Sequence, residues 1–479
     1  MHRVLPHTRR LAALLGLLAL CCFPAGARAD RAAEVSIMDD QLLLGASQQK
    51  INGEMVRFRR LGVDRLRVSA FWNQHAPSPN STRKLAGFDA GNPWDPAYNF
   101  GNLDRVIAGA HQHGLRVMIS ISTPAPIWAT GAPARRNPVW KPNPTEFGLF
   151  ARAVAGRYAG YADRFAVSNE PNHPTWLQPQ SLGGRMVSPD LYRAMVRAAY
   201  PRIKSINPAA SVLIGELAAM GSRVLAPGRP TRPLSFLRQL GCRTARYRPI
   251  RSGSCKGFQP IVAEGIGHHP YAFFQTPTSR SRNPNDAAIG DGGRLLRTLD
   301  RLTRVGALTP SRGRRFNVFY TEFGYQTRPP DPSGVSLGAQ SRYLQQAAYI
   351  AWRTPRVREI NQFRLTDGRI AGSGPKKYLE FQSGLLFRNR RKKPAFNAFP
   401  HPFVISGNRF WGQVRVGDGP HTVQVQRLRG RRWETVMRLL VSDPRGYFSR
   451  VLGGRLPGTY RYSYSNRTIK GTSATVRVR

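Results

Sequence analysis

Short apolar runs alternate with longer, helix-patterned segments from Val35 to about Phe399. The apolar runs predict strands at Gln41–Gly45, Arg65–Ser69, Leu115–Ile121, Arg164–Ser168, Ser211–Gly215, Gly265–His269, Asn317–Thr321 and Glu359–Leu365. Between them, helices are predicted at Gln48–Leu61, Leu103–His113, Thr145–Tyr158, Pro189–Ile206, Gly293–Val305 and Leu337–Arg353. Eight strands with interleaved helices predict an α/β fold of the (β/α)8 TIM-barrel type. A doubly wound open sheet is the alternative, but no Gly-rich phosphate loop follows the first strand.

Three connections are too long to be simple turns: Trp72–Phe100, Thr123–Asn143 and Gly221–Glu264. In a barrel, the loops that follow the strands build the face that carries the active site. Trp72 and Trp128 stand just after the second and third predicted strands. We interpret them as platforms on which a ligand stacks, with packing in the core as the alternative.

The pattern changes after Pro402. Short alternating strands separated by Gly, Pro and Asp turns are predicted at Phe410–Val416, Thr422–Arg427, Trp433–Val441, Tyr447–Val451, Thr459–Ser465 and Thr472–Val478. They predict a small β-sandwich over residues 403–479, after a barrel domain of residues 30–402. We expect this sandwich to fold separately from the chemistry of the barrel, either binding carbohydrate or packing as a passive module.

The N-terminus has the pattern of a signal peptide. A basic segment with Arg3, Arg9 and Arg10 precedes the apolar run Leu11–Phe23, and small residues suited to cleavage follow up to Ala29. The run is too short to span a bilayer, and no later stretch is long and apolar enough to do so. We therefore expect residues 1–29 to be removed and the protein to be secreted, monomeric and without a transmembrane segment.

Two cysteines, Cys242 and Cys255, lie outside this signal peptide. They stand in one Gly- and Arg-rich loop, and disulfides persist in the oxidising environment of a secreted protein. We predict that they form a disulfide, because nothing nearby in the sequence would activate a catalytic thiol.

The chain is strongly basic, with 73 Lys and Arg against 26 Asp and Glu and a net charge of +47. This charge is compatible with affinity for anionic cell-envelope polymers. The alternative is a uniformly basic surface from an Arg-biased genome, since the arginines are scattered along the chain. Secretion and the absence of a basic arm argue against a specific nucleic-acid partner.

Two glutamates follow apolar strands directly. Glu170 stands in Ser168-Asn169-Glu170-Pro171, and Glu322 in Tyr320-Thr321-Glu322-Phe323-Gly324. On parallel strands of one barrel, the two carboxyl groups meet at one face. Such a pair is what cleavage of a glycosidic bond needs: one group protonates the leaving oxygen and the other attacks the sugar.

Other residues near strand ends can complete this site. The Asn169 amide can bind the sugar 2-hydroxyl, and Arg67, His269 and Tyr271 can reach Glu322. We expect Arg67 to keep the pKa of Glu322 low, as a nucleophile needs, and the pKa of Glu170 to be raised, as an acid needs. Glu216 and Asp367 also stand near strand ends, where each can bind sugar hydroxyls or form a structural salt bridge.

The sequence resembles glycoside hydrolases of clan A, particularly families 5 and 39. The resemblance is carried by Leu66-Arg67-Val68, Asn169-Glu170-Pro171, His269-Pro270-Tyr271 and Thr321-Glu322-Phe323-Gly324, in that order and spacing. It implies a retaining mechanism with Glu170 as general acid/base and Glu322 as nucleophile. The chain departs from family 5 by lacking a His near the end of the third strand. It also has Gln362-Phe363-Arg364 where that family has a Trp on the eighth strand.

We therefore expect a secreted retaining glycosidase that acts on the O-glycosidic bonds of a poly- or oligosaccharide. No cofactor is expected. No metal is expected either, because His268-His269 lacks further ligands at suitable spacing. The rival hypothesis is a non-catalytic protein that binds the cell wall or anionic glycans through a barrel scaffold. The presence of Asn169, Glu170, Tyr271 and Glu322 together argues against it.

Overall fold

The computed structural model describes residues 33–451 and 457–478 of the 479-residue chain. The predicted signal peptide, residues 1–29, lies outside the described residues. Within the described ranges, none of the helices combines the length and the apolar character that crossing a membrane requires.

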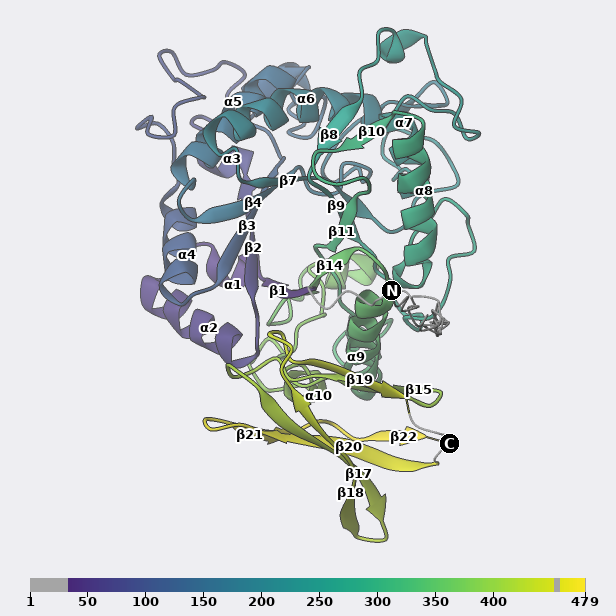
Figure 1. The fold of residues 1–479 in the computed structure, drawn as a ribbon. Coiled ribbons are helices and arrows are strands. Elements are labelled where there is room, and N and C mark those ends of the chain that lie inside the picture. The colour runs from purple at the N-terminus through teal and green to yellow at the C-terminus, as the bar shows by residue number, and fades with distance from the viewer. Residues whose placement is uncertain (1–32, 452–456, 479) are drawn as a thin grey trace, which may run out of the picture.

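Eight parallel strands close into a barrel, and helices surround it (Figure 1). The barrel strands are β1 (Glu34–Met38), β2 (Arg65–Phe71), β3 (Arg116–Ser122), β4 (Ala162–Val167), β7 (Ser211–Ala218), β9 (Gly265–His269), β11 (Asn317–Tyr320) and β14 (Val357–Phe363). Each strand lies beside its predecessor in the chain, and β1 pairs with β14 to close the ring. This confirms the predicted TIM barrel.

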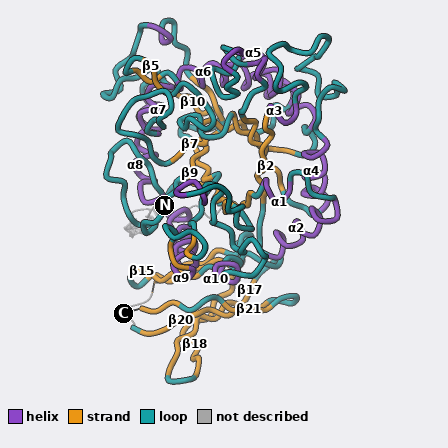
Figure 2. Tube along the Cα trace, turned by 180° about the vertical axis from the view of Figure 1, so that it is seen from behind, coloured by secondary structure: helices purple, strands orange, loops and turns teal. Residues whose placement is uncertain are grey.

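The large helices lie where the sequence pattern predicts them. They are α2 (Gln48–Arg60), α4 (Gly101–Gln112), α5 (Pro144–Arg157), α6 (Ser188–Ile206), α8 (Gly292–Arg304) and α9 (Leu337–Arg353). Shorter helices are α1 (Asp40–Leu43), α3 (Trp72–His75), α7 (Pro233–Leu240) and α10 (Pro394–Ala398). The helices pack against the barrel strands and bury the apolar outer faces of those strands. Figure 2 shows the helices around the ring of strands from behind.

The prediction of the first strand at Gln41–Gly45 is wrong. The first barrel strand is β1, Glu34–Met38, and most of the predicted stretch forms helix α1. The physical reason is that β1 is wholly buried yet alternates apolar and polar residues, because Glu34 and Ser36 hydrogen-bond to groups of the neighbouring strands. The apolar run Leu42–Leu44 belongs to α1 and the turn after it.

The barrel interior is built in layers of different polarity. The lower layer is ionic, with Glu34 paired to Arg65 at 2.8 Å and to Arg164 at 3.0 Å, and with Arg164 also paired to Glu359. Above it, Met118, Ala166, Leu213 and Phe319 form a small apolar cluster. The layer above holds charged side chains again, and those form the site described below. Side-chain layers of this kind fill the interior of TIM barrels.

Short strand pairs stabilise the long loops. They are β5 (Ser181–Leu182) with β6 (Arg185–Met186), β8 (Ile261–Ala263) with β10 (Leu308–Pro310), and β12 (Thr327–Arg328) with β13 (Val335–Ser336). The predicted disulfide between Cys242 and Cys255 is present and closes the loop that follows α7.

Two antiparallel sheets face each other after Pro402, as predicted for a β-sandwich. One sheet contains β15 (Phe403–Ser406), β16 (Arg409–Gln413) and β19 (Tyr447–Val451). The other contains β17 (His421–Arg429), β18 (Arg432–Val441), β20 (Gly458–Ser465), β21 (Lys470–Thr472) and β22 (Val476–Val478). Phe403, Phe410, Val423 and Tyr462 lie in a core that is separate from the core of the barrel.

The sandwich packs on the barrel beside α9 (Figure 1). Trp411 of β16 lies 5.5 Å from Tyr349 and 5.9 Å from Trp352, measured between ring centroids. Arg445 pairs with Asp64 at 2.7 Å and approaches Glu34 of the lower barrel layer at 3.7 Å. The second module therefore covers apolar and charged groups of the first.

We predict that removing residues 403–479 destabilises the barrel, because Tyr349 and Trp352 lose the aromatic side chains that cover them. The midpoint of thermal unfolding should fall by about 5–10 °C relative to the full chain. Calorimetry of both proteins measures the shift. An unchanged midpoint would show that the interface contributes nothing to barrel stability.

Candidate active site

A cavity of about 950 Å³ opens at the carboxyl ends of the barrel strands. Asn169, Glu170, Tyr271 and Glu322 line it together. Among the three long loops predicted to build this face, Gly221–Glu264 contributes to the wall through residues 221, 222, 229 and 230. The loops Trp72–Phe100 and Thr123–Asn143 do not line the cavity. No lining residue belongs to the C-terminal sandwich.

Glu170 is held by an unusual backbone at the end of β4. Its φ is 36°, and Ser168 has a φ of 63°, both in the left-handed region that non-glycine residues rarely adopt. The Glu170 amide donates to the Glu216 carbonyl at 3.1 Å. Outliers of this kind concentrate at functional sites, where the surrounding structure compensates their cost. The turn after β4 therefore places the Glu170 carboxylate in the cavity wall.

Glu322 follows β11 and is nearly buried, with 7% of its surface exposed. Arg67 donates from Nη1 to Glu322 Oε1 at 3.0 Å, and the Tyr271 hydroxyl donates to Oε2 at 3.0 Å. The sequence expectation that both side chains reach this carboxylate agrees with these contacts. Arg67 does not end its strand, however, but lies in the middle of β2 with its side chain fully buried.

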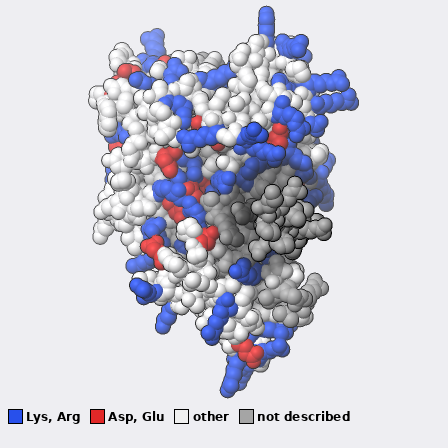
Figure 3. Space-filling model, viewed as in Figure 1, with Lys and Arg blue, Asp and Glu red and all other residues white. Residues whose placement is uncertain are grey.

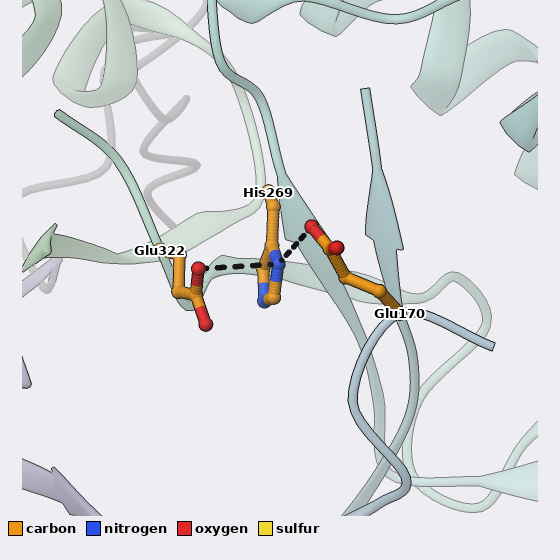
Figure 4. A group of neighbouring side chains, drawn as sticks. All are labelled: Glu170, His269 and Glu322. Atoms are coloured by element: carbon orange, nitrogen blue, oxygen red, sulfur yellow. Dashed lines mark hydrogen bonds and ion pairs between the residues drawn. The ribbon is translucent and has the colours of Figure 1, made fainter. Parts of the chain in front are cut away.

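His269 lies between the two carboxylates, as Figure 4 shows. Its Nδ1 donates to Glu170 Oε1 at 2.9 Å and lies 3.6 Å from Glu322 Oε2. The hydrogen bond of His269 is therefore to Glu170, whereas the sequence indicated Glu322. One oxygen of each carboxylate and a His269 ring nitrogen all lie within 4.8 Å of one another.

The pKa directions differ from those expected. Burial alone would lower the pKa of His269, but the charge of Glu322 and the hydrogen bond to Glu170 outweigh burial and raise it to about 9. Burial would raise the pKa of Glu170, but the hydrogen bond and charge of His269 outweigh burial and lower it. The pKa of Glu322 is raised by burial, which His269 and Arg67 only partly offset. In the free site, the proton therefore rests on His269.

Glu216 is a third buried carboxylate of the site. The sequence left open whether it binds sugar hydroxyls or forms a structural salt bridge. It stands at a bulge in β7 and is fully buried. Arg67 donates to it twice, from Nε at 2.9 Å and from Nη2 at 3.0 Å. Gly267 on β9 leaves the necessary space, because a Cβ there would lie 2.7 Å from Glu216 Cγ. Coulombic attraction of Arg67 holds the pKa of Glu216 far below its ordinary value despite burial.

Asn169 joins the same network. Its Oδ1 accepts a hydrogen bond from Arg67 Nη2 at 2.8 Å, and its backbone amide donates to Ser122 Oγ at 3.1 Å. Because Oδ1 faces Arg67, the amide nitrogen is the atom of this side chain left to meet a ligand. Asn169 therefore stands beside Glu170 in the cavity wall, as expected from the sequence.

Trp72 and Trp128 do not line the cavity. Trp72 is fully buried and stacks on Phe150, with ring centroids 5.8 Å apart. Trp128 lies edge-on to Trp72 at 6.2 Å, and its Nε1 donates to the Pro77 carbonyl. Both side chains therefore pack in the core, which was the alternative interpretation, and neither is a stacking platform in the cavity wall.

Aromatic side chains of other loops form the cavity wall instead. Phe363 ends β14, and Phe381 follows in the next loop at 5.4 Å between ring centroids. Tyr271 lies 6.2 Å from Phe363 and 6.1 Å from Phe381. These rings occupy the side of the cavity where the sequence lacks the Trp of family 5.

Polar side chains beyond β1 complete this side. Asp39 accepts hydrogen bonds from the Leu365 and Thr366 amides, which fix it. Asp40 accepts from the Ser69 amide, but its buried Oδ2 has no hydrogen-bond partner among the described residues. Burial raises the pKa of Asp40 to about 6. Asp40 is therefore an acceptor available to a ligand. It could not be recognised from the sequence, because the first strand was predicted after it, at Gln41–Gly45, and not before it, at Glu34–Met38.

Asp367, the other carboxylate noted near a strand end, is structural. It pairs with the buried Lys393 ammonium at 2.7 Å. In the part of the chain that the structure describes, the side chains grouped closely enough to hold a metal ion are those of Glu170, His269 and Glu322.

The fold is shared with solved glycoside hydrolases. A family 39 glycoside hydrolase from the gut symbiont Bacteroides cellulosilyticus WH2 is similar with a TM-score of 0.52 at 13% identity, over 88% of this chain and 81% of that chain. A GH5_18 protein from Streptomyces cattleya, in complex with GlcNAc, gives 0.48 at 14% identity, over 76% and 78% of the two chains. At 13% identity, the likeness to the family 39 structure shows the fold alone. No family model matches the chain, and no curated protein does.

The raised pKa of His269 predicts a loss of stability in alkaline solution. With a pKa of 6.5 in the unfolded chain and about 9 in the fold, its contribution is complete below pH 6.5 and is lost as the pH rises through about 9. This corresponds to about 3 kcal/mol. Urea unfolding of the wild type should show that loss between about pH 6 and pH 9, and His269→Asn should not.

His268→Asn is the matched control. Burial lowers the pKa of His268 to about 4, so this side chain is neutral throughout the tested range. The control should keep the pH dependence of the wild type. The same alkaline loss in His269→Asn would contradict a protonated His269.

We predict that Glu216→Gln shifts the pH profile of the site. The negative charge of Glu216 helps to raise the pKa of Glu322. Without that charge, Arg67 also loses its ion pair with Glu216 and keeps the one with Glu322. The pKa of Glu322 should therefore fall, and the acidic limb of kcat/KM should move to lower pH. A variant that loses stability without this shift would show that Glu216 is only structural.

Proposed function

We propose that this protein is a secreted glycoside hydrolase that cleaves O-glycosidic bonds with retention of configuration. One observation carries the proposal: Glu170 and Glu322 face one cavity, and one oxygen of each carboxylate lies within 4.8 Å of one oxygen of the other. Retaining glycosidases hold their carboxyl groups about 5–5.5 Å apart, whereas inverting ones leave about 6.5–9.5 Å for a water molecule. The short separation supports double displacement.

In the first step, Glu322 attacks the anomeric carbon, and the bond from that carbon to the leaving oxygen breaks. Glu170 gives its proton to the leaving oxygen. In the free site this proton rests on His269 Nδ1, 2.9 Å from Glu170 Oε1, and one transfer along that hydrogen bond makes Glu170 an acid. Arg67 and Tyr271 orient the attacking carboxylate through both of its oxygens.

In the second step, a water molecule attacks the anomeric carbon and gives a proton to Glu170, and Glu322 leaves as a carboxylate. The Asn169 amide is placed to bind the 2-hydroxyl of the sugar, a contact that strengthens in the transition state. Asp40 Oδ2 offers a further acceptor for sugar hydroxyls. The proton then passes from Glu170 Oε1 back to His269 Nδ1, which restores the starting protonation.

Secretion is supported by the N-terminal sequence pattern and by the disulfide Cys242–Cys255, since such bonds persist in oxidising compartments. The basic surface supports contact with anionic cell-envelope polymers. Figure 3 shows Lys and Arg spread over the visible face. Residues 403–479 hold fifteen Lys and Arg against three Asp and Glu, which makes the sandwich the more basic module for its size. We propose that it keeps the enzyme near such polymers.

The proposal predicts different losses for the two glutamates. Glu322→Ala should abolish hydrolysis of every glycoside, because no covalent intermediate forms. Glu170→Ala should lower kcat by about 10²–10⁴ for leaving groups that need protonation and should spare 2,4-dinitrophenyl glycosides. A panel of 4-nitrophenyl and 2,4-dinitrophenyl glycosides measures both effects.

Glu380→Gln, on a loop of the same face but paired with Arg369, is the matched control and should retain activity. NMR of the first product should show the anomer of the substrate. Release of the opposite anomer would refute retention. A folded wild type that hydrolyses none of the glycosides would refute the enzyme and favour the non-catalytic hypothesis.

A further inference from the structure

Four loops form one connected rim at the mouth of the cavity. They follow β7, β9, β11 and β14, which stand next to one another around the ring (Figure 1), and each contributes to the cavity wall. The loops span residues 219–232, 270–288, 321–336 and 364–384. Hydrogen bonds join each loop to the next: the Gly221 amide to Asp286 Oδ1 at 3.2 Å, the Tyr325 hydroxyl to the Gln275 carbonyl at 2.9 Å, and the Thr327 amide to the Gln382 carbonyl at 3.1 Å.

Six large apolar side chains of this rim are exposed to solvent. Phe273 and Leu379 also line the cavity, so these side chains begin at its mouth. Elsewhere on the described part of the barrel, exposed large apolar residues stand singly along the chain, which is ordinary, whereas contiguous ones mark an interaction site. The six are Val224 and Leu225 (64% and 43% exposed), Phe273 and Phe274 (44% and 71%), and Ile370 and Leu379 (43% and 66%).

The backbone of the rim is strained where it exposes an aromatic residue. Phe273 has a φ of 54°, which a bulky residue rarely adopts. Its ring stacks on Tyr271 with centroids 6.0 Å apart, which anchors the turn to the cavity wall. The next residue, Phe274, then lies in solvent, although burial of its ring would stabilise the fold. Strain of this kind is typical of a segment that contacts a ligand or a partner.

The available charges of the rim are all positive. Among the described residues of the four loops, the carboxylates of Glu322, Asp286, Asp331 and Asp367 are buried, and Glu380 pairs with Arg369 at 3.0 Å. Each loop carries at least one exposed cation that has no carboxylate partner within the described ranges. These cations are Arg223, Arg229, Arg280, Arg282, Arg328 and Lys377.

This combination of groups fits an anionic bilayer. Apolar side chains enter the boundary between lipid headgroups and acyl chains, and cations meet the lipid phosphates. An anionic polysaccharide would match the cations but would offer the phenylalanines no apolar region. A protein surface of mixed charge would not match cations spread over all four loops.

We propose that this rim docks the protein on membranes that contain anionic phospholipid, with the cavity mouth facing the bilayer. The inference does not depend on the glycosidase reaction. It assigns a contact on the barrel, separate from the contact with cell-envelope polymers that we propose for the sandwich.

Sedimentation with lipid vesicles tests the docking at about 0.15 M salt, where long-range attraction is screened. The full chain should sediment with vesicles of phosphatidylcholine and phosphatidylglycerol in equal parts, and not with phosphatidylcholine alone. The double variant Val224→Ser/Phe274→Ser should bind the anionic vesicles at least about tenfold more weakly, because less apolar surface enters the bilayer. Val436→Ser/Leu440→Ser removes two exposed apolar side chains of the sandwich and should bind like the wild type.

A second pair of variants tests the charge. Arg280→Gln/Arg282→Gln should weaken binding by about 25-fold, since each arginine near an anionic surface contributes about fivefold. Arg431→Gln/Arg432→Gln, at the hairpin of β17 and β18, removes the same charge from the sandwich and should change binding by less than about twofold. All four arginines are exposed, so none of these changes should unfold the protein.

Three results would overturn the proposal. One is a wild type that does not bind anionic vesicles or binds neutral ones equally well. Another is a set of rim variants that bind like the wild type. The third is an equal loss in the rim and sandwich variants, which would show that net charge alone attracts the protein to the vesicles.

Discussion

A fully buried guanidinium organises the upper half of this barrel. Arg67 has no access to water, so its charge must be matched by carboxylates within the barrel. Glu216 takes two of its hydrogen bonds and Glu322 takes one, and Asn169 takes another. The nucleophile of the proposed reaction is therefore positioned by the same ion that links β2 across the barrel interior to residues of β7 and of the segment after β11. The hydrogen bonds of Arg67 that orient the site therefore also help to hold the barrel together.

The proton on His269 links this network to the acid. Burial alone would favour neutral groups, yet three carboxylates around one imidazole favour its charged form. The pKa of Glu170 is consequently lowered and that of Glu322 is raised, which is the reverse of what an acid and a nucleophile need. The titration belongs to the group of side chains rather than to either glutamate.

Most of the fold and the meeting of Glu170 and Glu322 in one cavity could be predicted from the sequence, because apolar strand runs ended at these two residues. Features that depend on contacts inside the barrel could not be predicted from the sequence. Strand β1 was missed since Glu34 and Ser36 break its apolar pattern to meet charges on other strands. Trp72 looked like a sugar platform, but an aromatic residue after a strand suits the core equally well. The role of Glu216 depends on a bulge that no local pattern encodes.

The lower ionic layer has a consequence for the order in which the chain can fold. Strand β1 is among the first elements made, but its partners are Glu359 of β14, more than 300 residues later, and Arg445 of the sandwich. Until those segments exist, Glu34 lacks part of its pairing and the ring stays open. Such distant pairing slows folding. The closed ring therefore forms only once the C-terminal segments of the chain have been made.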